Sequence, residues 1–506
     1  MDGASHSTSA VEWIDLNSAQ LPVWLDLQNG TDPRSYVIGG YLRIAGAIDP
    51  ERLRRALALA IADNDALRLR VDADHPRQAF HAELLPPLDV LDISAAADPE
   101  AAFRTYIVRT FARPFDMAGG ALFHFVLAKG GERQWFLLIR YHHLIIDGMG
   151  ISLMIRAVAE AYATLSGAVT ERTVGAIPYS RFAAEDDAYR RSQRRERDLA
   201  YWRERLLPLP DSIFPPRFPS PALHEPSSPS PESSVKLWIE RPRYHAFLET
   251  CRARGASPFP VFLALLGALV GRMGARDELV IGVPVLNRAT AELKRGIGMM
   301  AGMMPFKLRL DGATTLAALV DEIGDRLRGD YRHQRAAIHD IHHALALAHG
   351  ERRLFDVALS YEKNDYDFPI GDAYFQLIGL TGGHEPNPLA LYVREYHRDK
   401  PVLVEFAFNA AHLTRAEVEM LAQRFARFFA AYLAGDDERV DALPVLSADE
   451  RQQVLTAWSA PARSLPATSV VALVEAQAAA HPGAIAVSMG ERALSYGDLA
   501  VRVAAL

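Results

Sequence analysis

The chain has 506 residues, with 55 Lys and Arg against 62 Asp and Glu for a net charge of −7, and a single cysteine, Cys251. One cysteine excludes an intrachain disulfide and a thiolate zinc site, so we expect a reducing, cytoplasmic environment. The acidic balance argues against nucleic-acid binding, and no apolar run approaches the roughly 18 to 20 residues of a membrane span. The start, MDGASHSTSAVEW, lacks the charged and apolar regions of a signal peptide.

The first half of the sequence alternates strand-like and helix-like patterns. Residues 49–62 predict a helix, with Asp49 as N-cap and Pro50 at its first position. The near-continuous apolar run WFLLIRY at 135–141 predicts a strand buried on both faces. Further patterns predict strands at 36–44, 66–72 and 121–128 and a helix at 151–165. This alternation predicts an α/β fold, an α+β sandwich.

The composition changes at residues 208–231, which hold 9 of the 31 prolines. Such a segment cannot continue a helix or a central strand, so we expect an exposed connector, with partner binding as the alternative. The arginine-rich helix before it, at 190–205, reads as a solvated face, or alternatively as a docking surface for an acidic partner. The second half then predicts helices at 260–273 and 414–433 and a strand at 279–284.

The strongest chemical signal follows the buried strand, where the chain reads HHLIIDG from His142 to Gly148. Adjacent strand residues point to opposite faces, so one histidine can enter a cleft while the other packs. A histidine is the natural base for an attacking amine or hydroxyl, and the glycine amides before the helix could donate to an oxyanion. Asp147 could orient an imidazole or pair with a distant arginine. An isolated histidine pair is more often structural.

The full HHxxxDG pattern, at a strand end and before a helix, resembles the condensation domains of nonribosomal peptide synthetases, relatives of chloramphenicol acetyltransferase. Other segments that resemble the family's motifs are LNSAQ at 16–20 with Trp24, NDALR at 64–68, RPFD at 113–116, YW at 201–202, GVPVLNR at 282–288, IGMM at 297–300, MP at 304–305, HQ at 333–334 and LPVLS at 443–447. The resemblance covers residues 16–458.

The tail resembles the start of an adenylation domain, with LSYGDL at 494–499, but it carries no glycine-rich phosphate loop. It ends within a predicted helix, so we expect the chain to be part of a longer polypeptide.

The resemblance implies two acetyltransferase-like lobes in a V shape with an active-site tunnel between them. The expected divisions are an N-terminal lobe at 1–178, a C-terminal lobe at 179–458, and a linker with the truncated adenylation start at 459–506. It also implies that His143 acts as base or positions the amine, and that Asp147 is structural and ion-paired with Arg288. His142 is then structural, and Gly148 is the candidate amide donor.

Two departures from the family concern the expected substrate channel. Gly302 and Met303 replace the usual Asn-Thr, and five methionines are close in sequence: Met273, Met299, Met300, Met303 and Met304. They indicate either adaptable core packing or a pliable channel in which Met299 and Met303 take part. Ser360 and Tyr361 lie on a strand that approaches the tunnel in the family, so they are further candidates for contacts with substrate.

Only a short segment precedes the first motif, so we expect a starter domain that N-acylates an amino acid with an acyl group from acyl-CoA (lipoinitiation). The alternative is an elongating domain supplied with a carrier-bound donor. Either implies a carrier domain with a phosphopantetheine arm and an adjacent adenylation domain as partners. No tightly bound cofactor is expected.

Competing assignments fit the sequence less well. An epimerising relative would continue differently after Gly148, a heterocyclising relative would replace the histidines by aspartates, and a non-catalytic relative tends to lose the histidine pair. A metal site at His339, His342 and His343 lacks an accompanying thiolate or carboxylate, so we expect no metal.

Overall fold

The computed structural model describes residues 12–81, 84, 88–111, 113–117, 120–167, 177–217, 233–347, 353–364, 366–370, 373–380, 385–435, 438–459 and 468–506. The chain divides into two compact units, Met1–Val445 and Leu446–Leu506. The short helix α12 (Ala448–Gln452), which buries no residue, falls in the second unit, and the expected division at 458/459 stays a prediction.

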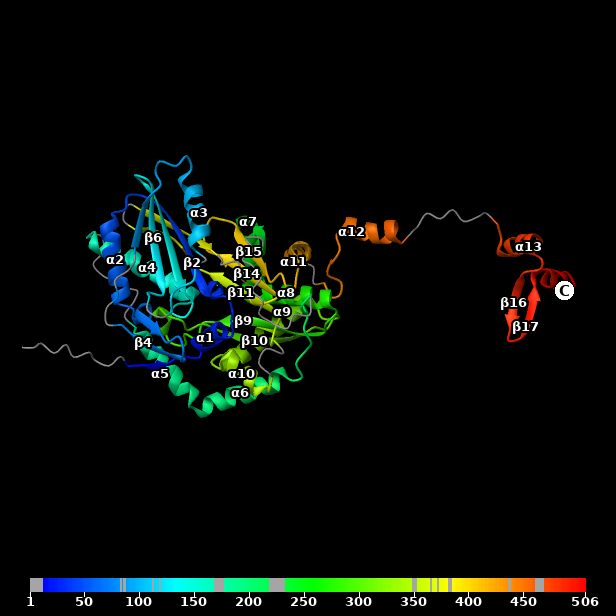
Figure 1. The fold of residues 1–506 in the computed structure, drawn as a ribbon, viewed down its shortest axis with the longest axis horizontal. Coiled ribbons are helices and arrows are strands. Elements are labelled where there is room, and N and C mark those ends of the chain that lie inside the picture. Colours follow the sequence, from blue (N-terminus) through cyan, green and yellow to red (C-terminus); the bar gives the residue numbers. More distant parts are fainter. Residues whose placement is uncertain are drawn as a thin grey trace, which may run out of the picture. The chain divides into compact units, whose positions relative to one another are not determined.

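The first unit contains two six-stranded mixed sheets (Figure 1). The first sheet has the order β12 (Asp367–Ile370), β13 (Ala373–Leu380), β2 (Val37–Ala45), β7 (Gln134–His142), β6 (Phe123–Gly131), β5 (Leu88–Asp92). The second has the order β10 (Gly302–Arg309), β9 (Glu278–Val285), β11 (Val357–Lys363), β14 (Leu389–Glu395), β15 (Val402–Phe408), β8 (Ser234–Ile239). A small third sheet joins β1 (Ile14–Asp15), β4 (Arg77–Phe80) and β3 (Leu69–Val71).

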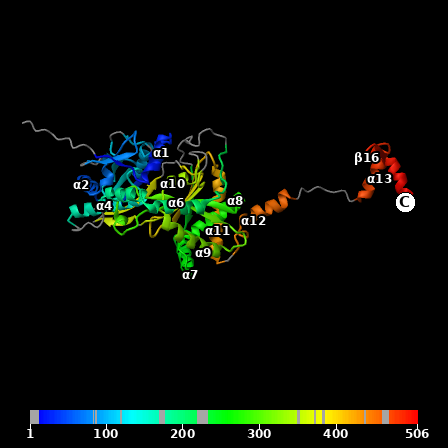
Figure 2. The ribbon, with the colours of Figure 1, turned by 90° about the horizontal axis from the view of Figure 1, so that it is seen from below.

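Helices cover both large sheets. The remaining helices of this unit are α1 (Gln20–Gln28), α2 (Pro50–Ala62), α3 (Pro99–Thr110), α4 (Gly148–Leu165), α5 (Tyr179–Arg190), α6 (Gln193–Leu206), α7 (Arg241–Ala253), α8 (Pro258–Gly274), α9 (Leu316–Asp330), α10 (Ile338–Ala344) and α11 (Arg415–Ala434). Helices α7, α8, α9 and α11 gather beside the second sheet (Figure 2). Among the described residues no single helix is long and apolar enough to span a membrane, although α7 and α8 together, bent by 100°, meet that test by length and composition.

Local sequence explains the elements that position the site. The side chain of Asp49 accepts hydrogen bonds from the amides of Glu51 and Arg52 and so begins α2, as predicted. Strand β7 is buried from Trp135 to His142. Its side chains enter one core on each face, with Leu137 in one and Leu138 in the other. The prediction of a strand buried on both faces is therefore confirmed.

Segments from beyond residue 178 take part in the first sheet and its core. Strand β13 belongs to the second half of the sequence, yet it pairs antiparallel with β2 in the first sheet. Its Phe375 and Leu377 bury their side chains in the core of that lobe, together with Tyr179 of α5. Apolar segments from beyond residue 178 thus complete the core of the first sheet, and the expected division at 178/179 stays a prediction.

The second unit contains the helix α13 (Val470–Ala480), a hairpin of β16 (Ile485–Met489) and β17 (Arg492–Ser495), and the helix α14 (Tyr496–Ala504). The helix, strand pair and final helix agree with the elements predicted for the tail. Of the proline-rich connector, residues 218–231 lie outside the described part. The preceding part of the connector, at 208–217, is held to the second half of the chain by Asp356. Its carboxylate accepts hydrogen bonds from the Ser212 hydroxyl and the Ile213 amide.

Candidate active site

The site lies where β7 ends and the chain turns into α4. The amide of His143 donates to the carbonyl of Tyr36 at 2.8 Å, which ties the turn to the start of β2. His142 is 1% exposed, whereas His143 is only partly buried. His142 thus ends the strand with its side chain buried, and His143 begins the turn with incomplete burial.

The imidazole of His142 packs in the protein interior. Its Nδ1 accepts a hydrogen bond from the amide of Leu144 at 3.1 Å, so the ring proton resides on Nε2. The ring stacks on Tyr36 at 6.3 Å and meets the edge of Phe115. Burial, together with the neighbouring His143, lowers the pKa of His142 to about 3. This histidine is therefore neutral at pH 7.

His143 has a buried ring nitrogen in a residue that is only partly buried as a whole. Its Nδ1 is buried and has no hydrogen-bond partner within the described residues. Burial lowers the pKa of His143, and nearby backbone carbonyl groups and the charge of Asp147 oppose that effect only in part. The ring is therefore a neutral base at pH 7, as a group that accepts a proton from an amine must be.

Asp147 does not orient either imidazole but pairs with Arg288. Its two carboxylate oxygens lie 2.8 and 2.9 Å from the Nη1 and Nη2 atoms of Arg288, and both side chains are almost fully buried. Burial alone would raise the pKa of Asp147, but the guanidinium outweighs it and the pKa is lowered. The bidentate geometry is the strong form of such a pair.

The same carboxylate also holds a loop from the second half of the chain. It accepts hydrogen bonds from the amides of Met300 at 3.0 Å and Ala301 at 2.9 Å. The amide of Asp147 donates to the carbonyl of Gly298 at 3.3 Å. Asp147 thus joins the turn after His143 to a loop about 150 residues away.

Gly148 begins α4 on the exposed side of the turn. A Cβ atom at this position would meet nothing within 4 Å, so open space adjoins its backbone. Asp147 is the N-cap of the helix and accepts a hydrogen bond from the Gly150 amide at 2.8 Å. The partial positive charge of a helix N-terminus thus lies beside the accessible face of the turn.

The methionines divide between core and loop. Met300 and Met304 are fully buried in the cores of the two lobes, and Met299 is 7% exposed. Met303 is partly exposed on β10. Core packing therefore accounts for Met300 and Met304, and Met303 is the more accessible of the two channel candidates.

Ser360 and Tyr361 lie on opposite faces of β11, so only one of them can face a given cavity. The hydroxyl of Tyr361 lies 2.8 Å from that of Tyr244 and 3.1 Å from Glu395, and its ring packs against the core of the second lobe. Ser360 contacts Glu362 on the other face. Of the two, Ser360 is therefore the one directed away from the core.

Two features of the site were missed in the sequence. Tyr179 donates a hydrogen bond to the carbonyl of Met299 at 2.8 Å, and Gln20 contacts the turn after His143. Gln20 stood in the LNSAQ segment, but no local pattern indicated what it contacts. Among the described residues no group of three His, Cys, Asp or Glu side chains could hold a metal ion.

The family model named Condensation domain matches residues 12–455, so the chain belongs to the condensation domain family. Condensation domains of nonribosomal peptide synthetases catalyse amide bond formation, an acyltransferase reaction. The expected fold class, with two lobes like those of chloramphenicol acetyltransferase, is confirmed by solved structures of this family.

The chain is similar to synthetases that are much longer than itself. It is 23% identical over 486 residues to the dimodular nonribosomal peptide synthase of Bacillus subtilis (strain 168), covering 96% of this chain and 20% of the synthase. It is 25% identical over 499 residues to enterobactin synthase component F of Escherichia coli O157:H7, covering 97% of this chain and 38% of that protein. The chain thus spans well under half the length of either relative.

Among solved structures, a double mutant of the starter condensation domain of rhizomide synthetase in complex with C8-CoA and Leu-SNAC has a TM-score of 0.76 and 25% identity to this chain. The match covers 86% of this chain and 98% of that one. The first condensation domain of the calcium-dependent antibiotic synthetase has a TM-score of 0.74 and 23% identity, covering 87% of this chain and 100% of that one. The second similarity concerns the fold alone.

Proposed function

We propose that this chain is a starter condensation domain, which transfers an acyl group from acyl-CoA to the amine of an amino acid on a carrier's phosphopantetheine arm. The observation that carries the proposal is the similarity to the rhizomide starter domain, which extends over 98% of that structure and 86% of this chain. That domain is bound to C8-CoA and Leu-SNAC, an acyl-CoA and an aminoacyl thioester.

In the proposed reaction the amine nitrogen attacks the thioester carbonyl carbon, and the carbon–sulfur bond breaks as the amide forms. His143 accepts the proton that the amine loses, and the same proton can then neutralise the departing thiolate of CoA. This role is supported by the incomplete burial of His143 and by the lowered pKa, which keeps the base neutral. Gly148 is the proposed amide donor to the oxyanion, because open space adjoins its backbone at the helix start.

We assign structural roles to His142 and to the pair of Asp147 and Arg288. His142 is almost wholly buried and its Nδ1 is occupied by the Leu144 amide. Asp147 accepts hydrogen bonds from Arg288 and from backbone amides, which leaves it without a free direction toward an imidazole. The proposed substrate channel includes Met299, Met303 and Ser360, whereas Tyr361 contributes through its contacts within the second lobe.

The proposed partners are a carrier domain that presents the amino acid and an adenylation domain that begins in the tail at 459–506. The second candidate function is elongation, in which another carrier delivers the donor. It is favoured by the curated relatives, which are multidomain synthetases of which this chain spans a small part.

The test uses the 506-residue chain with octanoyl-CoA and Leu-SNAC, and separately with an aminoacyl carrier as donor and Leu-SNAC as acceptor. We expect N-octanoyl-Leu-SNAC and free CoA in equal amounts by mass spectrometry, and no dipeptide. The His143→Ala variant controls for uncatalysed acylation. Dipeptide formation without acylation by octanoyl-CoA or by shorter and longer acyl-CoAs would assign the chain to elongation instead.

A further inference from the structure

The side chain of Gln20, at the first position of α1, contacts the backbone directly after His143. Its Nε2 donates to the carbonyl of Leu144 at 2.9 Å and to Oε1 of Gln78 at 2.8 Å. Gln20 is 0% exposed. A fully buried amide that reaches from the N-terminal helix to the active-site turn is costly unless all of its groups are paired.

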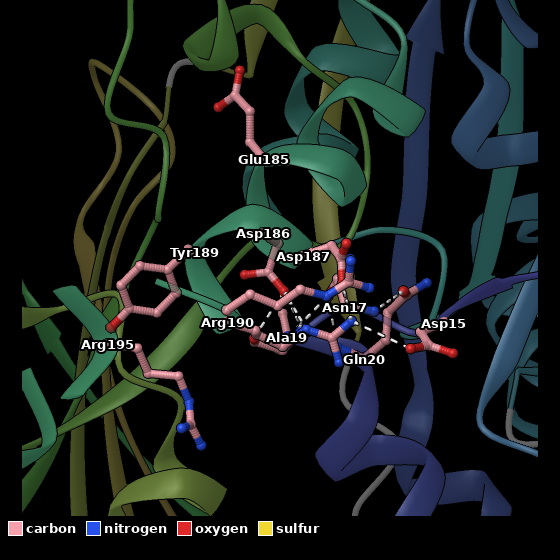
Figure 3. Close-up of polar contacts among 12 residues, drawn as sticks. Asp15, Asn17, Ala19, Gln20, Glu185, Asp186, Asp187, Tyr189, Arg190 and Arg195 are labelled. Carbon is pink, nitrogen blue, oxygen red and sulfur yellow. Dashed lines mark hydrogen bonds and ion pairs between the residues drawn. The ribbon is translucent and has the colours of Figure 1, made fainter. Parts of the chain in front are cut away.

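The hydrogen bonds fix which way the Gln20 amide points. Its Oε1 accepts the amide of Asn17 at 3.1 Å, and the Asn17 side chain in turn accepts the amides of Ala19 and Gln20 (Figure 3). Nε2 of Gln78 donates to the carbonyl of Asp15 at 3.2 Å, so Oε1 of Gln78 faces Gln20 as an acceptor. If the Gln20 amide turned over, its oxygen would face two other oxygens. The donor therefore stays directed at Leu144.

Leu144 directly follows His143, and both its backbone amide and its backbone carbonyl have hydrogen-bond partners. Its amide donates to His142 Nδ1 and its carbonyl accepts from Gln20. The amide of His143 itself is held by Tyr36. Without Gln20, the Leu144 carbonyl would lose its side-chain partner in a site where Leu144 is wholly buried.

We propose that Gln20 is a positioning residue for His143: it does not touch substrate, but it fixes the turn that directs the imidazole. This inference rests on the proposed function, because it takes His143 to act in amide formation. A misplacement of about 1 Å in a catalytic group can lower a rate by about 10²-fold, so the orientation of this turn has a measurable consequence.

The test compares Gln20→Met with Gln28→Met in the full chain. Gln28 lies at the other end of α1 and is exposed, and its Nε2 donates to the Ala73 carbonyl at 2.7 Å instead of to the turn. We expect Gln20→Met to lower kcat by about 10-fold or more with KM for both substrates within about 2-fold. We expect Gln28→Met to leave kcat unchanged. An equal effect of the two variants on kcat would overturn the proposal.

A double-mutant cycle separates this inference from the proposed function. If Gln20 acts through His143, then Gln20→Met added to His143→Ala lowers the rate no further. If His143→Ala alone has no effect, the assigned role of His143 is wrong, and the positioning role falls with it. If His143→Ala is impaired and Gln20→Met lowers it by the same factor as in the wild type, only the positioning role is wrong.

Gln78→Met provides a second variant in case Gln20→Met does not fold. It removes one partner of the Gln20 amide but keeps the bond to Leu144. We expect a smaller fall in kcat than for Gln20→Met, again absent in the His143→Ala background. An additive effect in that background would contradict the proposal.

Discussion

Replacing Arg288 by methionine should destabilise the first unit strongly, because it leaves the carboxylate of Asp147 buried without its counter-ion. Asp147 is 1% exposed and Arg288 5% exposed, so water cannot solvate the remaining charge without a local rearrangement. Removing one partner of a buried pair typically costs about 3 to 5 kcal/mol. The amides of Gly150, Met300 and Ala301 still donate to the carboxylate, which places the expected cost within that range.

The size of the unit converts this cost into a measurable shift. At about 2.1 cal/mol/K per residue, a unit of 445 residues has an unfolding entropy of about 0.9 kcal/mol/K. The expected fall in Tm is therefore about 3 to 5 °C if the unit unfolds as one, and about twice that if one lobe unfolds alone. Differential scanning calorimetry at pH 7 and a fixed scan rate measures it.

The double variant Asp147→Leu with Arg288→Met tests the reason for the shift. Because it removes both charges, it should be less destabilised than the two single variants combined. The exposed pair of Arg328 and Asp325 provides a control, since Arg328→Met should change Tm by less than about 1 °C. A Tm for Arg288→Met within about 1 °C of the wild type, or full additivity in the double variant, would refute this explanation.

Three further results are expected. His143→Ala should lower kcat by about 10²-fold or more. In the wild type, kcat should fall on acidification below about pH 6.5, because the base becomes protonated, and this fall should be absent in the variant. Product formation across the acidic to neutral range measures both effects. Gly298→Ala should lower both Tm and kcat, because φ is +153° there and a Cβ atom would lie 2.1 Å from the Tyr179 ring; an unchanged Tm would show that this close approach does not constrain the residue. His142→Asn should reduce the loss of stability on acidification, because the unfolded histidine takes up a proton below about pH 6.5 and the folded one only near pH 3. In the wild type the free energy of unfolding therefore falls by up to about 1.4 kcal/mol per pH unit between these values. The slope of the urea midpoint against pH measures this, and an unchanged slope in the variant would count against the explanation.

The sequence predicted elements whose cause is local. The helix at 50–62 follows from its Asp49 cap and apolar spacing, and the buried strand at 134–142 follows from its continuous apolar run. The contact between Asp147 and Arg288 was expected only from the resemblance, because the two residues are 141 positions apart. Nothing in their local patterns links them.

What the sequence did not predict depends on long-range pairing. The period-two pattern of residues 373–380 is compatible with either sheet, and only the tertiary packing of Phe375 and Leu377 assigns this strand to the first. The same limit applies to Gln20. A glutamine in the LNSAQ segment has many possible partners, and only the fold brings its amide to Leu144.

Two connections hold segments from the second half of the chain against the turn after His143 and against the first sheet. Asp147 bonds the turn to Arg288, Met300 and Ala301 of the segment after β9, and the ladder between β13 and β2 holds a second segment of the later sequence in the first sheet. Separation at Asp147 would expose a buried charge pair, which is costly, while breaking the ladder would release a row of backbone hydrogen bonds. Both connections therefore resist separation of these segments from the turn and from the first sheet.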